Sequence, residues 1–236
     1  MDTIKRNART AALLYLLLVL VAPIRLVYVP SQLFVSGDMA TTAANIMAHP
    51  GLFRLGILTD LFCATLEVFL TLALFRLFKD VDRRSAVLMA VLGLMPVPLY
   101  FVNVFNDVAV AHLLLGASPA GFTAEQVMSL VRLAMTLHDA GINMLQIFWG
   151  AWLFPLAALA AKSRLVPRFA AGWLFVNGVA YLALSVTGLV APSWNGTVSL
   201  AAVPAQLGEV VFVVCLLWCG IRGHRATSAP AAGAVA

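Results

Sequence analysis

Six apolar runs dominate this sequence of 236 residues. An α-helix needs about 20 residues to cross the roughly 30 Å hydrocarbon core of a bilayer. Backbone polar groups in lipid must be satisfied within the chain, which favours helices there. We therefore predict an all-α integral membrane protein built as a bundle of six transmembrane helices. The predicted spans lie at about 10–29, 55–77, 85–108, 132–160, 168–190 and 203–221.

The composition supports this class. Hydrophobic residues make up 62% of the chain and charged residues 11%, whereas a soluble domain is nearer half apolar and a quarter charged. The net charge of +5 is spread over short connections without a basic block. The predicted partner is therefore the lipid bilayer, and no nucleic acid is indicated. We expect one membrane domain over residues 1–221 and, because SAPAAGAVA is of low complexity, a disordered cytoplasmic tail over 222–236.

The positions of the lysines and arginines predict the orientation. The N-terminus, the connections at 76–84 and 162–168, and the C-terminus carry 12 of the 15 basic residues. Cytoplasmic loops carry the excess of Lys and Arg, so both termini are predicted to be cytoplasmic. The longest outer connection, 30–54, includes ATTAANIMAHP, which we expect to form a short surface helix. Within the third span, the PVP at 96–98 predicts a kink.

Polar side chains recur at helical spacing inside several spans. In the fourth span Arg132, Asp139, Asn143 and Gln146 fall in one sector, and His138 lies at its edge. With the N-terminus inside, the polar groups of the other spans reach the same outer half of the membrane. We therefore predict one polar cavity open to the extracytoplasmic side. Its further lining residues are Arg54, Asp60, Asn103, Asn106, Asp107, Asn177, Tyr181 and Gln206.

The acidic groups of this cavity point to its chemistry. The cavity has five carboxyl groups, which are those of Asp60, Glu67, Asp107, Asp139 and Glu209. They cannot all ionise without partners in a medium of low dielectric constant. They must be protonated, paired with Arg54 or Arg132, or bound to a cation. The predicted catalytic residues are Glu67, His138, Asp139 and Glu209. An acid such as Glu67 would be kept protonated by burial, and His138 would act as the base.

Three functions fit this pattern. The first is a proton-handling enzyme that acts on a lipid or isoprenoid-like substrate. The second is a transporter for a small cation, a proton or an amine, which would use the acids as a relay. The third is a sensor or partner subunit without catalytic activity, in which the 30–54 loop would be the recognition surface. Whether the protein is an enzyme therefore stays open, and the ligand is expected to be a hydrophobic or cationic small molecule.

The sequence assigns no cofactor and no oligomeric state. His138, His112 and the carboxylates could act as metal ligands, but no H-x-x-x-H, H-x-x-E-H or C-x-x-C spacing is present. The metal content is therefore left unassigned.

The chain also resembles a known family. The likeness covers about Ala8 to Gly220 and rests on ARTAALLYLLLVLVAP, YVPSQLFVSGD, LFRLGILTDL, LALFRLFKDVDRR, the segment from Leu137 to Leu182, and the late LGEVVF. On these residues it resembles the bacterial membrane proteins of domain-of-unknown-function family 4386. The resemblance implies a six-span protein of the bacterial inner membrane and implies no reaction. The positions that match include Arg54, His138, Gly141, Phe148, Gly150, Pro155, Ser163, Pro167, Tyr181 and Glu209.

Overall fold

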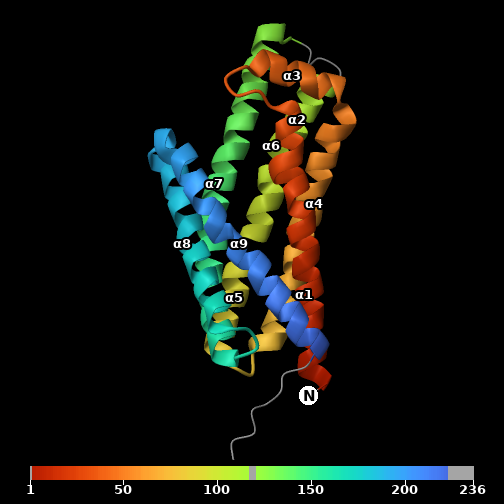
Figure 1. The fold of residues 1–236 in the computed structure, drawn as a ribbon. Helices are drawn as coiled ribbons and strands as arrows, with labels where there is room; N and C mark the ends of the chain where they lie inside the picture. Colours follow the sequence, from red (N-terminus) through yellow and green to blue (C-terminus); the bar gives the residue numbers. More distant parts are fainter. Residues whose placement is uncertain (1, 117–120, 223–236) are drawn as a thin grey trace, which may run out of the picture.

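The computed structural model describes residues 2–116 and 121–222, and its regular elements over those residues are all helical. In chain order they are α1 (Asp2–Pro23), the π-helix η1 (Ile24–Tyr28), α2 (Val29–Leu33), α3 (Met39–Ala48), α4 (Pro50–Phe78), α5 (Arg83–Leu94), α6 (Pro96–Leu115), α7 (Ala124–Ser163), α8 (Arg168–Val190) and α9 (Pro192–Arg222). The long helices form an elongated bundle. The N-terminus and the end of α9 lie at one end, and α3 lies across the other (Figure 1).

Six helical stretches are long and apolar enough to cross a membrane. They are Thr3–Leu33, Pro50–Phe78, Arg83–Leu115, Ala124–Ser163, Arg168–Val190 and Pro192–Ile221. The prediction of an all-helical, six-span membrane protein is thereby confirmed for the described residues. The cytoplasmic placement of the termini stays a prediction, and residues 223–236 of the predicted tail lie outside the described part of the chain.

Most of the helices are longer than the apolar runs that reveal them. The predicted last span begins at residue 203, whereas α9 begins at Pro192 and passes through Pro204. Proline is tolerated in the first helical turn because its missing N–H would be unpaired there anyway. Hydropathy detects the part of a helix that lies in hydrocarbon, and polar first turns such as Ser193 to Thr197 fall outside it.

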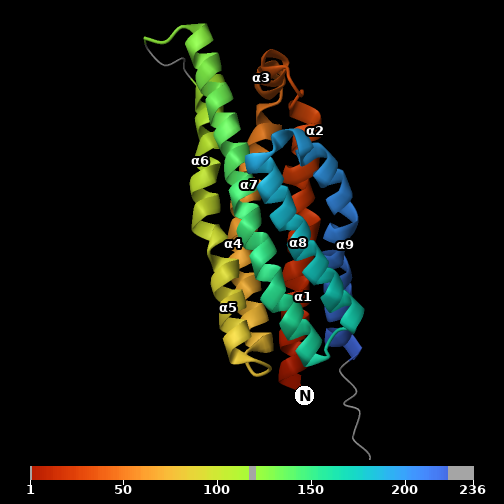
Figure 2. The same cartoon turned by 90° about the vertical axis from the view of Figure 1, so that its left-hand side faces the viewer.

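Two prolines shape the spans. Pro96 opens α6 directly after Met95, and the kink predicted from PVP is present as the junction between α5 and α6 (Figure 2). Pro23 ends α1, and the chain continues as a π-helix in which Val29 N–H donates to the carbonyl of Ile24. Proline removes a backbone donor from the helix, and π turns are frequent at functional sites. This π turn carries Arg25, which is only 7% exposed.

The half of the bundle near the termini is closed by a hydrophobic core. Tyr15 lies at its centre, with ring centroids 5.9 Å from Trp152 and 6.1 Å from Phe212. Leu70, Leu74 and other apolar side chains of α4, α7 and α9 complete this core. These buried aromatic and aliphatic groups fill that half of the described bundle.

Helices α7 and α8 pack with their backbones in close contact. A Cβ atom placed on Gly150 would lie 2.7 Å from the carbonyl oxygen of Gly178, and one placed on Gly178 would lie 2.9 Å from that of Gly150. Small residues at such positions let membrane helices approach closely. This pair therefore fixes the distance between the two helices that carry Trp149 and Tyr181.

The expected surface helix of the 30–54 connection is α3. Asp38 caps its N-terminus by accepting a hydrogen bond from Thr41 N–H at 3.0 Å. The hydroxyl of Thr41 donates to the same carboxylate at 2.6 Å, and these bonds hold the pKa of Asp38 below its ordinary value. Such a cap satisfies a backbone donor that the first turn of a helix otherwise leaves unpaired.

Candidate functional site

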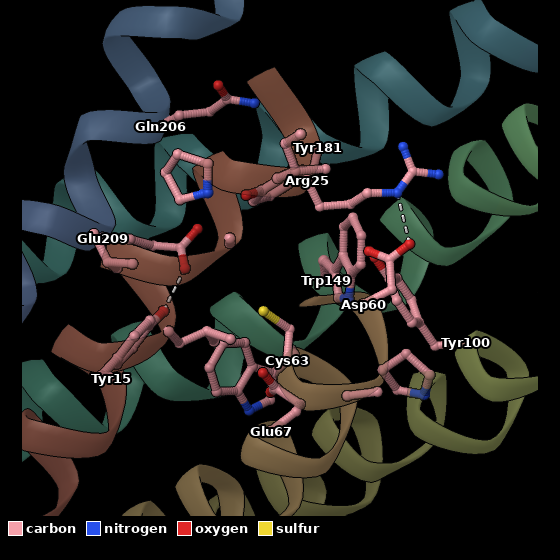
Figure 3. A pocket seen from close by; sticks show the side chains of 18 of the residues that line it. Tyr15, Arg25, Asp60, Cys63, Glu67, Tyr100, Trp149, Tyr181, Gln206 and Glu209 are labelled. Atoms are coloured by element: carbon pink, nitrogen blue, oxygen red, sulfur yellow. Dashed lines mark hydrogen bonds and ion pairs between the residues drawn. The ribbon is translucent and has the colours of Figure 1, made fainter. Parts of the chain in front are cut away.

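A cavity of about 250 Å³ lies within the bundle between α1, α4, α6, α7, α8 and α9 (Figure 3). Much of its wall is apolar and comes from Leu18, Val19, Ala22, Pro23, Leu26, Ala64, Pro96, Val97 and Val210. The polar and aromatic part consists of Tyr15, Arg25, Asp60, Cys63, Glu67, Tyr100, Trp149, Trp152, Tyr181, Gln206 and Glu209. Ligand sites in proteins have this character, a mostly apolar pocket with a few convergent polar groups.

Arg25 forms one wall of the cavity and is held by two aspartates. Its Nε donates to Asp60 Oδ2 at 2.8 Å, and its Nη2 donates to Asp107 Oδ2 at 2.7 Å. The other oxygen of Asp60 accepts a hydrogen bond from the Tyr100 hydroxyl at 2.8 Å. These side chains come from η1, α4 and α6, so the pairs tie three elements together. We call Arg25, Asp60, Asp107 and His138 the arginine centre.

His138 completes the arginine centre. Its Nε2 lies 2.9 Å from Nη2 of Arg25, which can only donate, so Nε2 is the acceptor. Its Nδ1 lies 3.3 Å from Asp107 Oδ2 and 3.4 Å from Asn103 Nδ2. The centre thus holds one cation and two carboxylates, and both nitrogens of His138 are engaged.

Two asparagines support this arrangement from behind. Asn103 Nδ2 donates to the carbonyl oxygen of His138 at 3.1 Å, which joins α6 to α7. Asn106 Nδ2 donates to the carbonyl oxygen of Asn103 at 3.0 Å. Neither asparagine lines the cavity. Their contacts position the backbone that carries His138.

Glu209 faces the cavity from α9. Its Oε2 accepts a hydrogen bond from the Tyr15 hydroxyl at 2.5 Å, and its Oε1 accepts one from Asn177 Nδ2 at 2.7 Å. The Tyr181 side chain lies beside the same carboxyl group. These donors come from α1 and α8 and orient the carboxyl group. Within the described chain, no lysine, arginine or histidine forms an ion pair with it.

Glu67 lies on the α4 wall of the cavity, one helical turn from Cys63. The Thr71 hydroxyl donates a hydrogen bond to its Oε1 at 3.4 Å. As with Glu209, no cationic side chain of the described residues pairs with it. A carboxyl group in such a place is either protonated or neutralised by a cation from outside the chain.

The arginine centre does not fit a metal ion as it stands. One ligand atom from each of Asp60, Asp107 and His138 lies within 4.8 Å of the others, and all three residues are buried. The guanidinium of Arg25 is hydrogen-bonded to all three of them. It therefore already supplies the positive charge that a metal would bring, and a metal would have to displace it.

The structure brings some of the predicted site residues to the cavity and leaves others outside. Those that line it are Asp60, Glu67, Tyr181, Gln206 and Glu209. Asp107, His138, Asn103 and Asn106 lie behind Arg25, and Asn177 lies behind Glu209. Arg54, Arg132 and Asp139 are exposed on the outside of the bundle.

The polar stripe of α7 is turned away from the cavity and towards α8. Asn143 packs on α8, since a Cβ atom on Gly188 would lie 2.4 Å from its Oδ1. Gln146 Oε1 is buried without a hydrogen-bond partner among the described residues. The face that reaches the cavity carries Trp149 and Trp152. This face is shifted from the polar stripe by one residue, and one residue corresponds to a rotation of about 100° around a helix.

The residues that the sequence pattern does not select are chiefly Arg25 and the aromatic side chains other than Tyr181. Arg25 stands at the end of the first apolar run, where an arginine ordinarily anchors a span at the interface. One signal was present: the apolar residues Leu26 to Val29 follow it, so it lies inside the run and not beyond it. Asp60 and Asp107 also need a buried cation, and Arg25 is the one that reaches them.

Comparison with known proteins gives a family. The family described as "Domain of unknown function (DUF4386)" matches residues 10–220. No curated protein and no solved structure gives a significant match.

Proposed function

The chain belongs to the family described as "Domain of unknown function (DUF4386)", so we propose a function for it from the chemistry of its cavity. The function is to bind, within the membrane, a small apolar molecule that carries one protonated amine. The observation that carries this proposal is the pair of half-buried carboxyl groups, Glu67 and Glu209, that face the cavity without a cationic partner from the described residues.

A ligand amine would satisfy these carboxyl groups. An isolated charge within the membrane costs about 3 kcal/mol or more, and a partner of opposite charge removes much of that cost. The amine neutralises one of the two carboxyl groups. A proton held by Glu67 or Glu209, or shared between them, neutralises the other. Hydrogen bonds from Tyr15 and Asn177 hold Glu209 in place before the ligand arrives, so little ordering is needed on binding.

The aromatic wall supports the same ligand class. The ring centroids of Trp149 and Tyr100 are 6.0 Å apart, and those of Trp149 and Tyr181 are 6.1 Å apart with their planes nearly perpendicular. Aromatic faces attract ammonium groups, by about 0.5–2 kcal/mol depending on desolvation. Apolar groups of α1 and α6 cover the rest of the wall and suit a hydrocarbon body.

The geometry favours binding over proton-transfer catalysis. The expected base, His138, has both ring nitrogens engaged by Arg25 and Asp107 and does not line the cavity. Asp139, the other expected catalytic residue of α7, is exposed outside it. The apolar core around Tyr15 and Phe212 also offers no polar path of the kind that a proton or ion relay would use.

The test is a comparison of octylamine with its uncharged counterpart 1-octanol. The full chain in lipid nanodiscs is titrated with each compound, with empty nanodiscs subtracted, and binding is followed by tryptophan fluorescence and by the unfolding temperature. We expect octylamine to bind at least about tenfold more tightly than 1-octanol, a difference of about 1.4 kcal/mol. Glu67→Gln and Glu209→Gln should each weaken octylamine binding by a similar factor.

Asp139→Asn is the matched control, because Asp139 is an acid within a span that lies outside the cavity. It should leave octylamine binding unchanged. Equal affinity for the two compounds, or loss of octylamine binding in the control to the same degree as in the cavity variants, would rule out the proposed function.

A further inference from the structure

Helices α1 and α9 touch near the termini and separate towards the other end of the bundle (Figure 1). Near the termini, a Cβ atom on Gly220 would lie 2.9 Å from the backbone nitrogen of Arg9. Half-way along, Tyr15 of α1 still bonds to Glu209. Beyond that point α9 follows α8, because Trp173 Nε1 donates to the carbonyl oxygen of Pro204 at 3.0 Å.

The cavity reaches the surface of the bundle where the two helices separate. Leu26 of η1 is 53% exposed and Val210 of α9 is 39% exposed, and both also line the cavity. Ala22 and Gln206 line it between them and are half-buried. We call Ala22, Leu26, Gln206 and Val210 the lateral portal.

The surface around the lateral portal is apolar. Leu20 on α1 is 65% exposed, and Val203 and Leu207 on α9 are each 51% exposed. These side chains belong to spans that cross the membrane, so hydrocarbon surrounds them. The lateral portal therefore opens sideways into the bilayer rather than into water.

Along the axis of the bundle, side chains of the described residues fill both ends of the cavity. Towards α3 the arginine centre joins η1, α4, α6 and α7 through buried ion pairs. Towards the termini the core around Tyr15, Trp152 and Phe212 fills the bundle. Breaking a buried ion pair by removing one partner costs about 3–5 kcal/mol, whereas the lateral portal is closed only by side chains that rotate.

We propose that the ligand enters and leaves the cavity sideways, from the bilayer, through the lateral portal. The ligand is then a single-chain amphiphile whose amine reaches Glu209 and Glu67 while its tail stays in the gap between α1 and α9. This deepens the proposed function, on which the identity of the head group rests. The cavity of about 250 Å³ holds about eight water-sized groups, so a longer chain has to extend through the opening.

Glu209 is placed to meet such a head group first. It lies next to Val210 in sequence and one turn from Gln206, so its carboxyl group stands at the inner edge of the lateral portal. Glu67 lies deeper, on the α4 wall. A hydrogen-bonding side chain at the opening, Gln206, gives the amine a polar contact on its way from the interface to Glu209.

The native thiol of Cys63 reports on access to the cavity, because Cys63 lies on its wall. The experiment uses the full chain in nanodiscs with Cys215→Ser and Cys219→Ser, which leaves Cys63 as the single cysteine. The rate of labelling is measured by mass spectrometry with an apolar N-alkyl maleimide that partitions into the bilayer. A permanently charged methanethiosulfonate that stays in water is used in parallel.

The lateral route predicts a specific pattern of rates. Ala22→Trp and Val210→Trp fill the lateral portal from its two sides, and each should slow maleimide labelling at least about tenfold. Leu20→Trp adds the same ring to α1 on its lipid-facing side and should change the rate less than about twofold. The charged reagent should label all variants far more slowly than the maleimide does. Unfolding temperatures of the variants show that each is folded.

Two results would overturn the lateral route. One is an unchanged maleimide rate in both Ala22→Trp and Val210→Trp. The other is labelling by the charged reagent as fast as by the maleimide, which would mean that the cavity opens to water. Protection of Cys63 by octylamine separates this proposal from the proposed function. If octylamine does not protect Cys63 but Ala22→Trp and Val210→Trp still slow maleimide labelling, the lateral route is supported and the amine site is refuted.

Discussion

Nη2 of Arg25 lies 2.7 Å from Oδ2 of Asp107, so the π turn that ends the first long helix is fastened to α6 by a buried ion pair. The same guanidinium holds Asp60 through its Nε. Both partners are almost fully covered, with side chains 8% and 4% exposed for Arg25 and Asp107. One side chain of η1 thus compensates the negative charges of Asp60 on α4 and Asp107 on α6.

Loss of this cation should therefore be costly. Arg25→Met leaves Asp60 and Asp107 buried without a cationic partner and should lower the free energy of unfolding by about 3–5 kcal/mol. Chemical denaturation in detergent micelles measures the change. Adding Asp60→Asn and Asp107→Asn to Arg25→Met should recover part of the loss, because the uncompensated charges are then gone.

Arg54→Met is the control for that series. Arg54 is exposed and forms no ion pair with the described residues, so its replacement should change stability by less than about 0.5 kcal/mol. A similar loss in Arg25→Met and Arg54→Met would contradict the role assigned to the arginine centre.

The short hydrogen bond between Tyr15 and Glu209 makes a second stability prediction. Tyr15→Phe removes the donor, leaves a Glu209 oxygen without its partner and should cost about 1–3 kcal/mol. In the Glu209→Gln background the same change should cost less. A double-mutant cycle gives the difference, and full additivity of the two changes would show that the bond contributes no coupling.

The contact between α7 and α8 gives a third prediction. Gly150→Ala would place a Cβ atom 2.7 Å from a backbone oxygen, which cannot rotate away, so the helices must separate at a cost of about 1–3 kcal/mol. Gly172→Ala on α8 meets nothing within 4 Å and should be neutral or stabilising by up to about 1 kcal/mol. Thermal unfolding of both variants checks this, and equal losses would refute the close packing.

Asp82, in the connection between α4 and α5, makes a pH-dependent contribution to the stability of the fold. Lys162 lies 2.5 Å from Asp82, and this hydrogen bond, with those from Ser85, lowers the pKa of Asp82 below the ordinary value of 3.8. A carboxyl group with a lower pKa in the folded state stabilises the fold above its unfolded pKa. The contribution is therefore present at neutral pH and is lost as the pH falls below 3.8 through the folded-state pKa.

Asp82→Asn tests this contribution. The amide still caps α5 but does not titrate, so the unfolding temperature of the variant should fall less steeply than that of the parent chain as the pH is lowered from about 4 to about 2. The same acid sensitivity in both proteins would assign the pH dependence to other groups.

The six stretches long and apolar enough to cross a membrane follow directly from the sequence, because the length of an apolar run has one dominant cause. The acids that line the cavity follow in part. Glu67 and Glu209 stand out as charges in hydrocarbon, and the structure places both on one cavity. Both acids can be recognised from the apolar residues beside them in the sequence, without knowledge of how the helices pack.

The position of Arg25 and the direction of α7 could not be derived in this way. Periodicity gives the spacing of side chains around a helix but not which neighbour each face meets. His138 points to Arg25, while Asp139, one residue later, is exposed. A rotation of about 100° separates the two positions, and only the packing of α7 between α6 and α8 decides which of them is inside.

The opening between α1 and α9 lies between elements from opposite ends of the chain order. At the end where they diverge, α1 continues into η1 and α9 follows α8, so no loop joins the two helices across the gap. The side chains at positions 22, 26, 206 and 210 line it. Natural substitutions at these four positions are therefore expected to change which tail lengths and branchings the proposed site admits, without altering the acids proposed to bind the head group.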